Sequence, residues 1–502
     1  MQWRTAVVKN KSIIFADMKI MYCIRGLHNS GGMERVLSVK ANLLASRGHE
    51  VSIVVLRLKG RKPFFPIDPS VNIVDLSAPY LSLPGHSSSA NATSDSPRTT
   101  VSSAVGSTSV PSTESASTES SASPVSSAAG ITSGPATGAS ERLKGSVRKR
   151  LSRVVEMLDP DVCVSLCGPE VRILPAVAGG RPCVAEYHFS HDKFYRKYGG
   201  IFMYPYAWLR THMLERAVSE YDCMVTLTEH DLPIWKRHCR RVERIFNPVT
   251  TPPGQVSRLA EKRMIAVGRL EDQKNFKDLV SAWSIVAERC PDWRLEIFGE
   301  GKLEHALRSQ IARLGLTGSV ILRGVVKDIA SEYSNSSALL MTSLHEGFPL
   351  ALVEASSFGL PLISYDCPTG PSEIIVDAGD GGFDGDGAGA GAGAGDGDGG
   401  GAGDGADAGA GADAGADHCV NSYGGDSAGN VPAATLDQAA GNTPNGYLVP
   451  VGDVCTLADR ICRIASDDNL RLRLGAASKA SSRRFTPETI ISAWEHLFSS
   501  LL

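Results

Sequence analysis

The stretch MIAVGRLEDQKNF, residues 264–276, decides the fold of this chain. A short apolar run typical of a buried strand, 264–267, ends in a Gly-Arg turn, and a helical pattern follows near 276–288 before an apolar strand returns at 294–298. A strand, a crossover helix and a second strand form a βαβ unit, which implies parallel strands joined by a right-handed crossover. Such sheets bind ligands at the carboxyl ends of their strands, so the Gly-Arg turn is a candidate binding site.

The same pattern occurs once more, nearer the start of the chain. A strand at 20–24 is followed by a Gly-rich turn, a helix near 33–45 and a strand at 51–56. The 502 residues, of which 42% are hydrophobic, exceed what one core supports and suffice for two domains. The Pro-rich segment 247–254 discourages both helix and strand and is the natural linker. The sequence therefore predicts an α/β protein with two Rossmann-like domains facing a cleft.

Two tracts of low complexity interrupt this pattern. The first consists mainly of Ser, Thr, Ala, Gly and Pro, and the second mainly of Gly, Ala and Asp, so neither can offset its ordering entropy by burying apolar surface. We expect both to be disordered surface insertions. The predicted organisation is a loose N-terminal extension at 1–17, an N-terminal domain at 18–250 with an insertion at 84–140, a C-terminal domain at 251–486 with an insertion at 378–444, and an amphipathic helix at 487–502 that packs across the domains.

Charge and cysteine content exclude several classes of function. A net charge of −3 and a pI near 6.5 give no basic field of the kind that nucleic-acid binding requires. The 11 cysteines form no repeated C-x-x-C pair, which argues against a zinc site and a disulfide framework. Residues 1–17 lack the apolar core of a signal peptide, and no run of about 18 uncharged apolar residues could span a membrane. We expect a cytoplasmic protein.

Two cations accompany the Gly-Arg turn. Arg269 and Lys274 lie beside the carboxyl end of the strand, where the N-terminus of the following helix also favours an anion. Arginine grips phosphate oxygens in a bidentate fork and lysine supplies a mobile charge, so the pair suits a diphosphate leaving group. A solvated charged turn explains the two residues equally well.

A second loop, at 343–359, brings two carboxylates to the start of a helix. The N–H groups beside Phe348, Pro349 and Leu350 form an anion cradle if Pro349 occupies the first helical turn. Glu354 then faces the same cradle about one turn inside the helix, where it could accept hydrogen bonds from two ribose hydroxyls, while Glu346 lies in the loop. The alternative is that both carboxylates bind no ligand and only lie at the start of a helix, where acidic residues are favourable.

The spacing of Glu346 and Glu354, with Gly-Phe-Pro-Leu between them, resembles the E-x7-E motif of retaining glycosyltransferase family 4. The segment SGGMER at 30–35 resembles the family's N-terminal GGxER loop, and GRLEDQKN at 268–275 resembles its diphosphate segment. Further similarities to family landmarks lie at 298–301 and 445–449, and the segment 365–374 resembles the DCxxGPxEI stretch of bacterial polysaccharide transferases.

The resemblance implies a GT-B fold in which the C-terminal domain binds a nucleotide-sugar donor and the N-terminal domain binds the acceptor. It assigns Glu354 to the ribose, and Glu346 and His188 to the sugar near the reacting carbon. The residues that it places at the donor diphosphate are Arg269, Lys274, Gly31, Gly32, Gly347, Phe348, Pro349 and Leu350. No metal and no cofactor are then needed, because the nucleotide-sugar is a substrate.

The assignment of His188 depends on its position after a predicted strand at 182–184 rather than on a motif. His191 and Asp192 follow closely and raise the question of a metal site. The sequence offers no third ligand beside them, so a polar loop is the preferred interpretation.

We therefore predict a retaining glycosyltransferase that moves a sugar from a UDP-sugar to a glycan or lipid-linked acceptor in polysaccharide biosynthesis. Two basic and aromatic stretches, 142–153 and 193–210, favour a lipid-linked acceptor and peripheral contact with the inner face of a membrane, although solvated helix faces are the simpler interpretation of each. The alternatives are a nucleotide-sugar epimerase or phosphorylase and a noncatalytic protein that binds glycans or nucleotides.

Overall fold

The computed structural model describes residues 17–78, 80–81, 141–142, 146–198, 200–251, 253–379 and 443–502. The predicted insertion at 84–140, most of the predicted insertion at 378–444 and residues 1–16 of the predicted extension lie outside the described residues.

The N-terminal half of the chain is built on a seven-stranded sheet in the order β3-β2-β1-β6-β7-β8-β9. Every neighbouring pair in it is parallel. Val, Ile and Cys dominate these short strands, as expected for strands that are covered on both faces. The strands are β1 (Lys19–Ile24), β2 (Glu50–Val55), β3 (Asn72–Asp75), β6 (Val162–Ser165), β7 (Cys183–Glu186), β8 (Cys223–Thr226) and β9 (Val242–Arg244). A separate antiparallel pair consists of β4 (Tyr80–Leu81) and β5 (Glu141–Arg142).

The C-terminal half contains a six-stranded sheet in the order β12-β11-β10-β13-β14-β15, again parallel throughout. Counted from its first strand, this is the order 3-2-1-4-5-6 of a doubly wound nucleotide-binding fold. Its strands are β10 (Arg263–Val267), β11 (Arg294–Phe298), β12 (Val320–Gly324), β13 (Ala338–Met341), β14 (Leu362–Tyr365) and β15 (Gly446–Val449). The two parallel sheets confirm the predicted α/β fold class.

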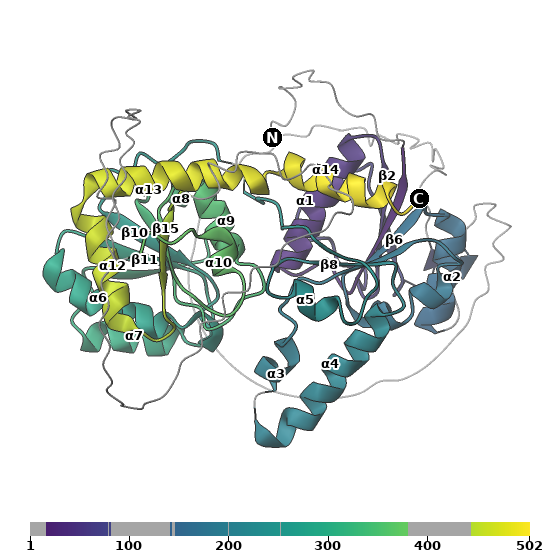
Figure 1. The fold of residues 1–502 in the computed structure, drawn as a ribbon, viewed down its shortest axis with the longest axis horizontal. Helices are drawn as coiled ribbons and strands as arrows, with labels where there is room; N and C mark the ends of the chain where they lie inside the picture. The colour runs from purple at the N-terminus through teal and green to yellow at the C-terminus, as the bar shows by residue number, and fades with distance from the viewer. Residues whose placement is uncertain are drawn as a thin grey trace, which may run out of the picture.

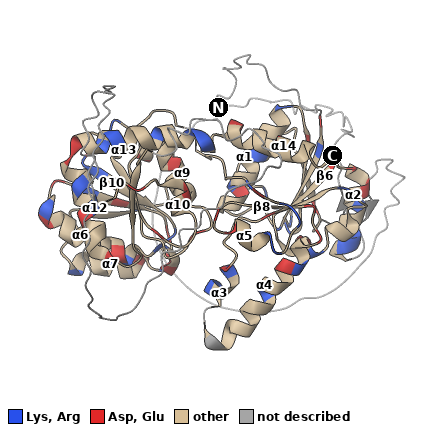
Figure 2. Ribbon diagram, viewed as in Figure 1, with Lys and Arg blue, Asp and Glu red and all other residues tan. Residues whose placement is uncertain are grey.

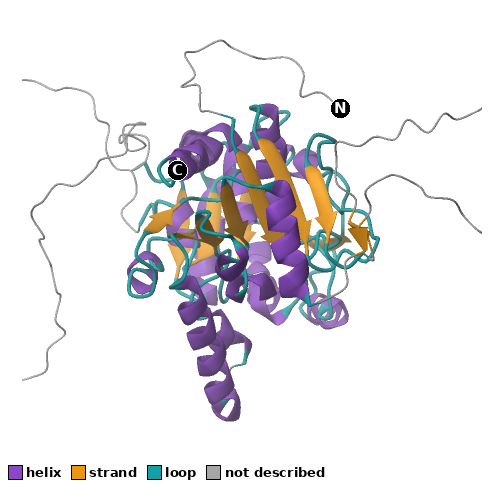
Figure 3. Ribbon diagram, turned by 90° about the vertical axis from the view of Figure 1, so that its right-hand side faces the viewer, coloured by secondary structure: helices purple, strands orange, loops and turns teal. Residues whose placement is uncertain are grey.

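Helices cover both faces of the sheets (Figures 1 and 3). Those of the N-terminal half are α1 (Gly32–Ser46), α2 (Val147–Leu158), η1 (Pro169–Arg172), η2 (Pro175–Val177), α3 (Lys193–Lys197), η3 (Ile201–Met203), α4 (Tyr204–Val218) and α5 (Leu232–Trp235). Those of the C-terminal half are η4 (Asp272–Lys274), α6 (Phe276–Arg289), α7 (Glu304–Arg313), α8 (Ile329–Ser334), α9 (Leu350–Ser357), α10 (Pro371–Ile374), α12 (Val454–Ser466), α13 (Asp468–Ser481), η5 (Ser482–Phe485) and α14 (Pro487–Ser499).

The last helix returns to the first domain. After α13 runs along the C-terminal half, α14 continues in line and lies beside α1 (Figure 1). Its residues Ile491, Trp494 and Phe498 are buried in the same core as β1 and β2. The physical reason is the amphipathic pattern of α14, whose apolar side is buried when it packs on this core. The two halves are therefore joined twice by the chain.

The helices α3 and α4 extend away from the body of the N-terminal half (Figure 1). Only the C-terminal part of α4 contributes buried apolar residues such as Leu214 and Val218 to the core. No helix within the described ranges is long and apolar enough to cross a membrane.

Candidate active site

The turns after β10 and β13 bring a lysine and a glutamate together. These strands are neighbours in a parallel sheet, so their carboxyl ends lie at one edge. Lys274 Nζ, at the end of η4, donates to Glu346 Oε1 at 2.6 Å across 72 residues of sequence. Water reaches little of either side chain, so the attraction between the two charges is stronger than it would be in bulk water. The two motifs therefore meet at one site.

Arg269 lies in the same turn but does not join this pair. Its side chain is 68% exposed, and Nη1 forms an ion pair with Glu271 Oε1 at 3.2 Å. The turn itself is tight because a Cβ atom at Gly299, where φ is 139°, would clash with the carbonyl oxygen of Gly268. A mobile guanidinium beside a fixed turn could swing toward an anion without moving the backbone.

The loop between Glu346 and α9 is held by packing rather than by charge. The ring of Phe348 is buried and stacks on Phe246 at 5.4 Å between centroids, so only the backbone of Phe348 is suited to an anion. Pro349 is the N-cap of α9, with φ −77° and ψ 98°, and α9 begins at Leu350. Pro349 thus precedes the first helical turn instead of occupying it as predicted. Thr369 Oγ1 donates to the carbonyl oxygen of Glu346 and braces the loop.

Glu354 is buried and its carboxylate already has protein partners. Its Oε1 lies 2.9 Å from Arg35 Nη1 and accepts hydrogen bonds from Thr250 Oγ1 at 2.5 Å and Thr251 Oγ1 at 3.1 Å. Its Oε2 accepts a hydrogen bond from Tyr333 Oη at 3.2 Å. Because Arg35 belongs to α1, Glu354 links the two halves of the molecule. A ribose could take the carboxylate only by replacing some of these partners.

The glycine pair of the N-terminal half faces the same helix. Gly31 caps α1 and Gly32 begins it, and a Cβ atom at Gly32 would lie 3.1 Å from Leu350 Cδ1. On the neighbouring loop, a Cβ atom at Gly347 would lie 2.5 Å from the carbonyl oxygen of His188. The approach at Gly347 needs glycine, because a Cβ atom would meet the backbone of the other loop, whereas a Cβ atom at Gly32 would meet only the movable end of the Leu350 side chain.

His188 follows β7 and is buried beside Glu186. Its Nε2 lies 3.1 Å from Glu186 Oε1, outside hydrogen-bond geometry. Lys40 Nζ donates to both oxygens of Glu186, at 2.6 and 2.7 Å. Burial acts to raise the pKa of Glu186, but Lys40 and His188 outweigh it and lower that pKa from 4.5 to about 2. His188 therefore lies beside a carboxylate that is charged at neutral pH.

The buried pair of Lys40 and Glu186 was not foreseen from the sequence. The side chains are 1% and 2% exposed, and Lys40 Nζ lies 3.7 Å from the centroid of the Trp494 ring of α14. Burial lowers the pKa of Lys40, while Glu186 acts to raise it. The available signal was a lysine among the apolar residues of the predicted helix at 33–45, since a lysine there must be paired.

A second lysine near His188 was also missed. Lys193 Nζ lies 3.0 Å from the ring centroid of Phe189, and burial lowers the pKa of Lys193 to about 8. On the facing loop, burial and Arg196 lower the pKa of His345, the neighbour of Glu346. Lys193 and His345 therefore lose their protons at lower pH than exposed groups of the same kind. Shifted pKa values of this kind are common where substrates bind.

Comparisons with known proteins agree with this geometry. Residues 252–383 match the family model for glycosyl transferases group 1. An uncharacterized glycosyltransferase of Haemophilus influenzae is 26% identical over 360 residues, which are 71% of this chain and 83% of that protein. The amylovoran biosynthesis glycosyltransferase AmsD of Erwinia amylovora is 40% identical over 119 residues, 24% of this chain and 33% of that protein, so this match spans a third of its length.

A solved structure, that of Anabaena HepE in complex with UDP and glucose, has the same fold. It aligns with a TM-score of 0.55 over 96% of this chain and 100% of that chain, at 14% identity. The fold, the family model and the relatives together define a glycosyltransferase with the GT-B architecture. The residues that match the group 1 model, 252–383, lie in the C-terminal half and include Lys274, Glu346 and Glu354.

Proposed function

We propose that this chain is a retaining glycosyltransferase of family 4 that transfers a hexosyl unit from a UDP-sugar to a glycan or lipid-linked acceptor. The observation that carries the proposal is the pair formed by Lys274 and Glu346 at the carboxyl edge of the sheet, against the His188 loop of the other half. A transferase of this type needs a cation at its leaving group and a carboxylate at its sugar, and this pair supplies both.

Donor binding would separate the two partners. Lys274, joined by the exposed Arg269, would turn to the diphosphate, and Glu346 would be free to face the sugar. Two protein cations at the diphosphate make a catalytic metal unnecessary there. The structure of HepE with UDP and glucose supports a uridine donor for this chain by analogy.

The chemical step follows from retention of configuration. The bond from the anomeric carbon to the donor phosphate oxygen breaks, and the acceptor oxygen bonds to that carbon on the same face. The acceptor's proton passes to the departing phosphate oxygen. Negative charge grows on that phosphate as the bond breaks, so Lys274 and Arg269 stabilise the transition state more than the ground state. Glu346 would stabilise the positive charge that develops on the sugar.

Glu354 would bind the ribose by exchange of partners. In this conformation Arg35, Thr250 and Thr251 contact Glu354 Oε1, and two ribose hydroxyls could take the place of some of these partners. The exchange would release Arg35, on the opposite half, from its contact with the donor domain. Donor binding and the relative position of the two halves would then be coupled.

A lipid-linked acceptor and peripheral membrane contact are supported by α3 and α4. The segment that joins them exposes Phe202 at 94%, and Tyr204 and Trp208 on α4 are also exposed. Basic residues on α3 lie close by, as Figure 2 shows. Aromatic rings beside cations suit the boundary between lipid headgroups and acyl chains. AmsD is by its name a glycosyltransferase of amylovoran biosynthesis, which supports a biosynthetic role for this chain.

The donor assignment can be tested with a panel of nucleotide sugars. We expect one uridine-linked sugar to raise the melting temperature of the purified protein and to be hydrolysed slowly without acceptor. Lys274→Ala and Glu346→Gln should lower turnover by about 100-fold or more, which is the cost of losing one strong electrostatic contact to the transition state. Lys277→Ala is the matched control, because Lys277 is exposed on the first turn of α6 and should leave turnover unchanged.

The alternatives give different results in the same assay. A noncatalytic protein would bind a donor without consuming it, and an epimerase would change the sugar without releasing the nucleotide. A product of inverted anomeric configuration, read by NMR of the transferred sugar, would rule out the retaining mechanism. If no nucleotide sugar binds at all, the transferase proposal fails.

Membrane contact is tested separately, by sedimentation with vesicles. We expect the protein to sediment with vesicles that contain anionic lipid and far less with neutral ones. The double variant Phe202→Ser, Trp208→Ser should lose this binding, whereas Phe64→Ser, which removes another exposed aromatic ring, should keep it. Equal binding by both variants would contradict a role for α3 and α4.

A further inference from the structure

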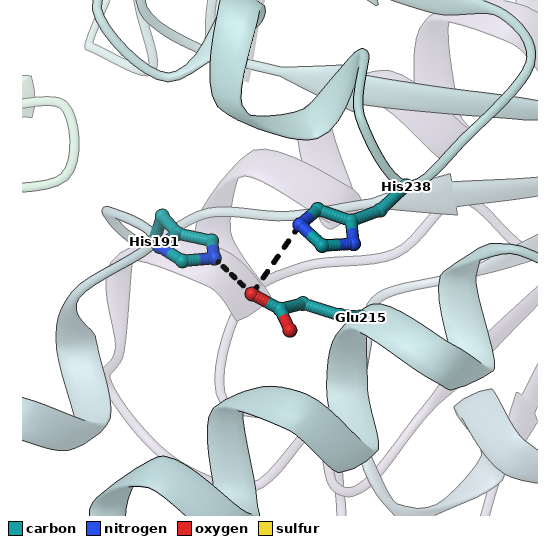
Figure 4. A group of neighbouring side chains, drawn as sticks. All are labelled: His191, Glu215 and His238. Carbon is teal, nitrogen blue, oxygen red and sulfur yellow. Dashed lines mark hydrogen bonds and ion pairs between the residues drawn. The ribbon is translucent and has the colours of Figure 1, made fainter.

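Three side chains from distant parts of the N-terminal half meet at one carboxylate oxygen (Figure 4). His191 lies in the loop between β7 and α3, Glu215 on α4, and His238 just after α5. Glu215 Oε1 lies 2.9 Å from His191 Nε2 and 3.4 Å from His238 Nε2. One ligand atom from each residue falls within 4.8 Å of the others. The side chains are 16%, 15% and 30% exposed, so the cluster is sheltered but open to ions from solvent.

The two imidazole rings are held in place by a buried tryptophan. They are nearly parallel, with 13° between their planes and 6.4 Å between centroids. Both rings stand edge-on to Trp235, which is fully buried. Contacts of this kind fix the direction in which each Nε2 points before any ligand arrives. Preorganised, converging nitrogen atoms are what distinguishes a metal site from a chance group of polar residues.

The spacing of these atoms fits a tetrahedral ion. Ligand atoms at about 2.1 Å from a tetrahedral zinc ion lie about 3.4 Å from one another, close to the separations between Glu215 and the two histidines. His212 Nδ1 lies 3.5 Å from the other oxygen of Glu215 and outside the group of three, so the fourth ligand of the ion would be water. Asp192, the neighbour of His191 in sequence, is not part of this group, and it accepts hydrogen bonds from Ser190 and Arg196.

We propose that His191, Glu215 and His238 form a structural site for a divalent ion of the zinc class. Two imidazoles and one carboxylate are typical zinc ligands, whereas magnesium and calcium prefer an all-oxygen shell. The ligands share no residue with the Lys274 and Glu346 pair, so we assign the ion a structural and not a catalytic role. The proposal does not rest on the proposed function.

The ion would connect the base of the projecting helix α4 to the His188 loop, which forms one wall of the active site. His191 is three positions after His188, on the loop whose backbone lies against Gly347. Glu215 lies where α4 returns to the core. A bond from each to one ion would hold the His188 loop at a set distance from α4. The metal would thus be a positioning device for the N-terminal half.

The test uses the full chain, freed of metal with a chelator and titrated with Zn²⁺. We expect one ion to bind per chain, to raise the melting temperature, and, when Co²⁺ replaces it, to give visible d–d absorption of a tetrahedral site. His191→Ala, His238→Ala and the conservative Glu215→Gln should each weaken Zn²⁺ binding by at least about 10-fold. His305→Ala is the control, because it removes an exposed histidine of α7 and should change none of these readings.

Several outcomes would overturn the proposal. Absence of a bound ion and of a Co²⁺ spectrum would do so directly. Binding that survives in all three variants would place the ion elsewhere, and sulfur-to-cobalt charge-transfer bands would assign it to cysteines. Circular dichroism of each metal-free variant, compared with that of the metal-free wild type, separates loss of ligand from loss of folding. Donor hydrolysis plays no part in these measurements, so failure here leaves the proposed function standing.

Discussion

Replacement of Lys40 by methionine tests how much stability depends on the buried ion pair. The substitution keeps most of the side-chain volume but leaves Glu186, only 2% exposed, without the cation that now donates to both of its oxygens. Breaking one side of a buried pair costs about 3–5 kcal/mol in free energy of unfolding. The pKa of Glu186 is lowered from 4.5 to about 2 by Lys40 and His188 against the effect of burial, which is the direction that this cost requires.

The assay is thermal and urea unfolding of the variant beside the wild type. A loss of about 3 kcal/mol should lower the melting temperature of a domain of this size by roughly 6–12 °C. Trp494, whose ring centroid lies 3.7 Å from Lys40 Nζ, offers a fluorescence probe at the site itself. The double variant Lys40→Met, Glu186→Gln should recover most of the loss, because no buried charge then remains unpaired.

The same pair predicts a pH dependence with a definite sign. The pKa of Glu186 in the folded protein is lower than in the unfolded chain, so its stabilisation is complete above about pH 4.5 and is lost as the pH falls toward 2. Glu186→Gln should remove this part of the acid sensitivity. The reasoning is refuted if Lys40→Met costs less than about 1 kcal/mol, or if the two substitutions simply add in the double variant.

Two further predictions concern close packing. Gly347→Ala would place a methyl group 2.5 Å from the carbonyl oxygen of His188, so we expect a raised KM for the donor and a lower melting temperature. Gly318→Ala is the control, because a Cβ atom there meets nothing within 4 Å and should change neither quantity. Equal behaviour of the two variants would contradict the packing argument. Trp494→Ala should cost about 3–5 kcal/mol by emptying a core position, measured by urea unfolding; a loss below about 1 kcal/mol would mean that α14 is dispensable.

The regular elements could be predicted because their signals are local. The strand expected at 264–267 is observed at Arg263–Val267, and the helix expected near 276–288 is observed at Phe276–Arg289. Apolar runs, glycine turns and amphipathic periods are all contained in a few consecutive residues. General rules for parallel sheets then gave the α/β fold class, whereas the order of the strands was not predicted.

The polar partners could not be predicted, because they depend on which strands become neighbours. The sequence around Glu186 does not indicate that Lys40 is its partner, and the sequence around His191 does not indicate Glu215 or His238. Glu354 shows the same limit, since its place on α9 was expected but its contact with Arg35 across the two halves was not. Pairings between distant residues arise from tertiary packing, which a reading of local pattern does not contain.

The return of α14 to the first domain has a consequence for biosynthesis. Trp494 and Phe498 lie in the core that β1 and β2 begin, yet they are synthesised after the whole C-terminal sheet. The N-terminal sheet thus leaves the ribosome with part of its apolar face bare, and it stays so until α14 emerges. The N-terminal half is therefore synthesised first but completes its core last. Separate expression of residues 18–250 should give a product that aggregates, and an added α14 peptide should reduce this aggregation.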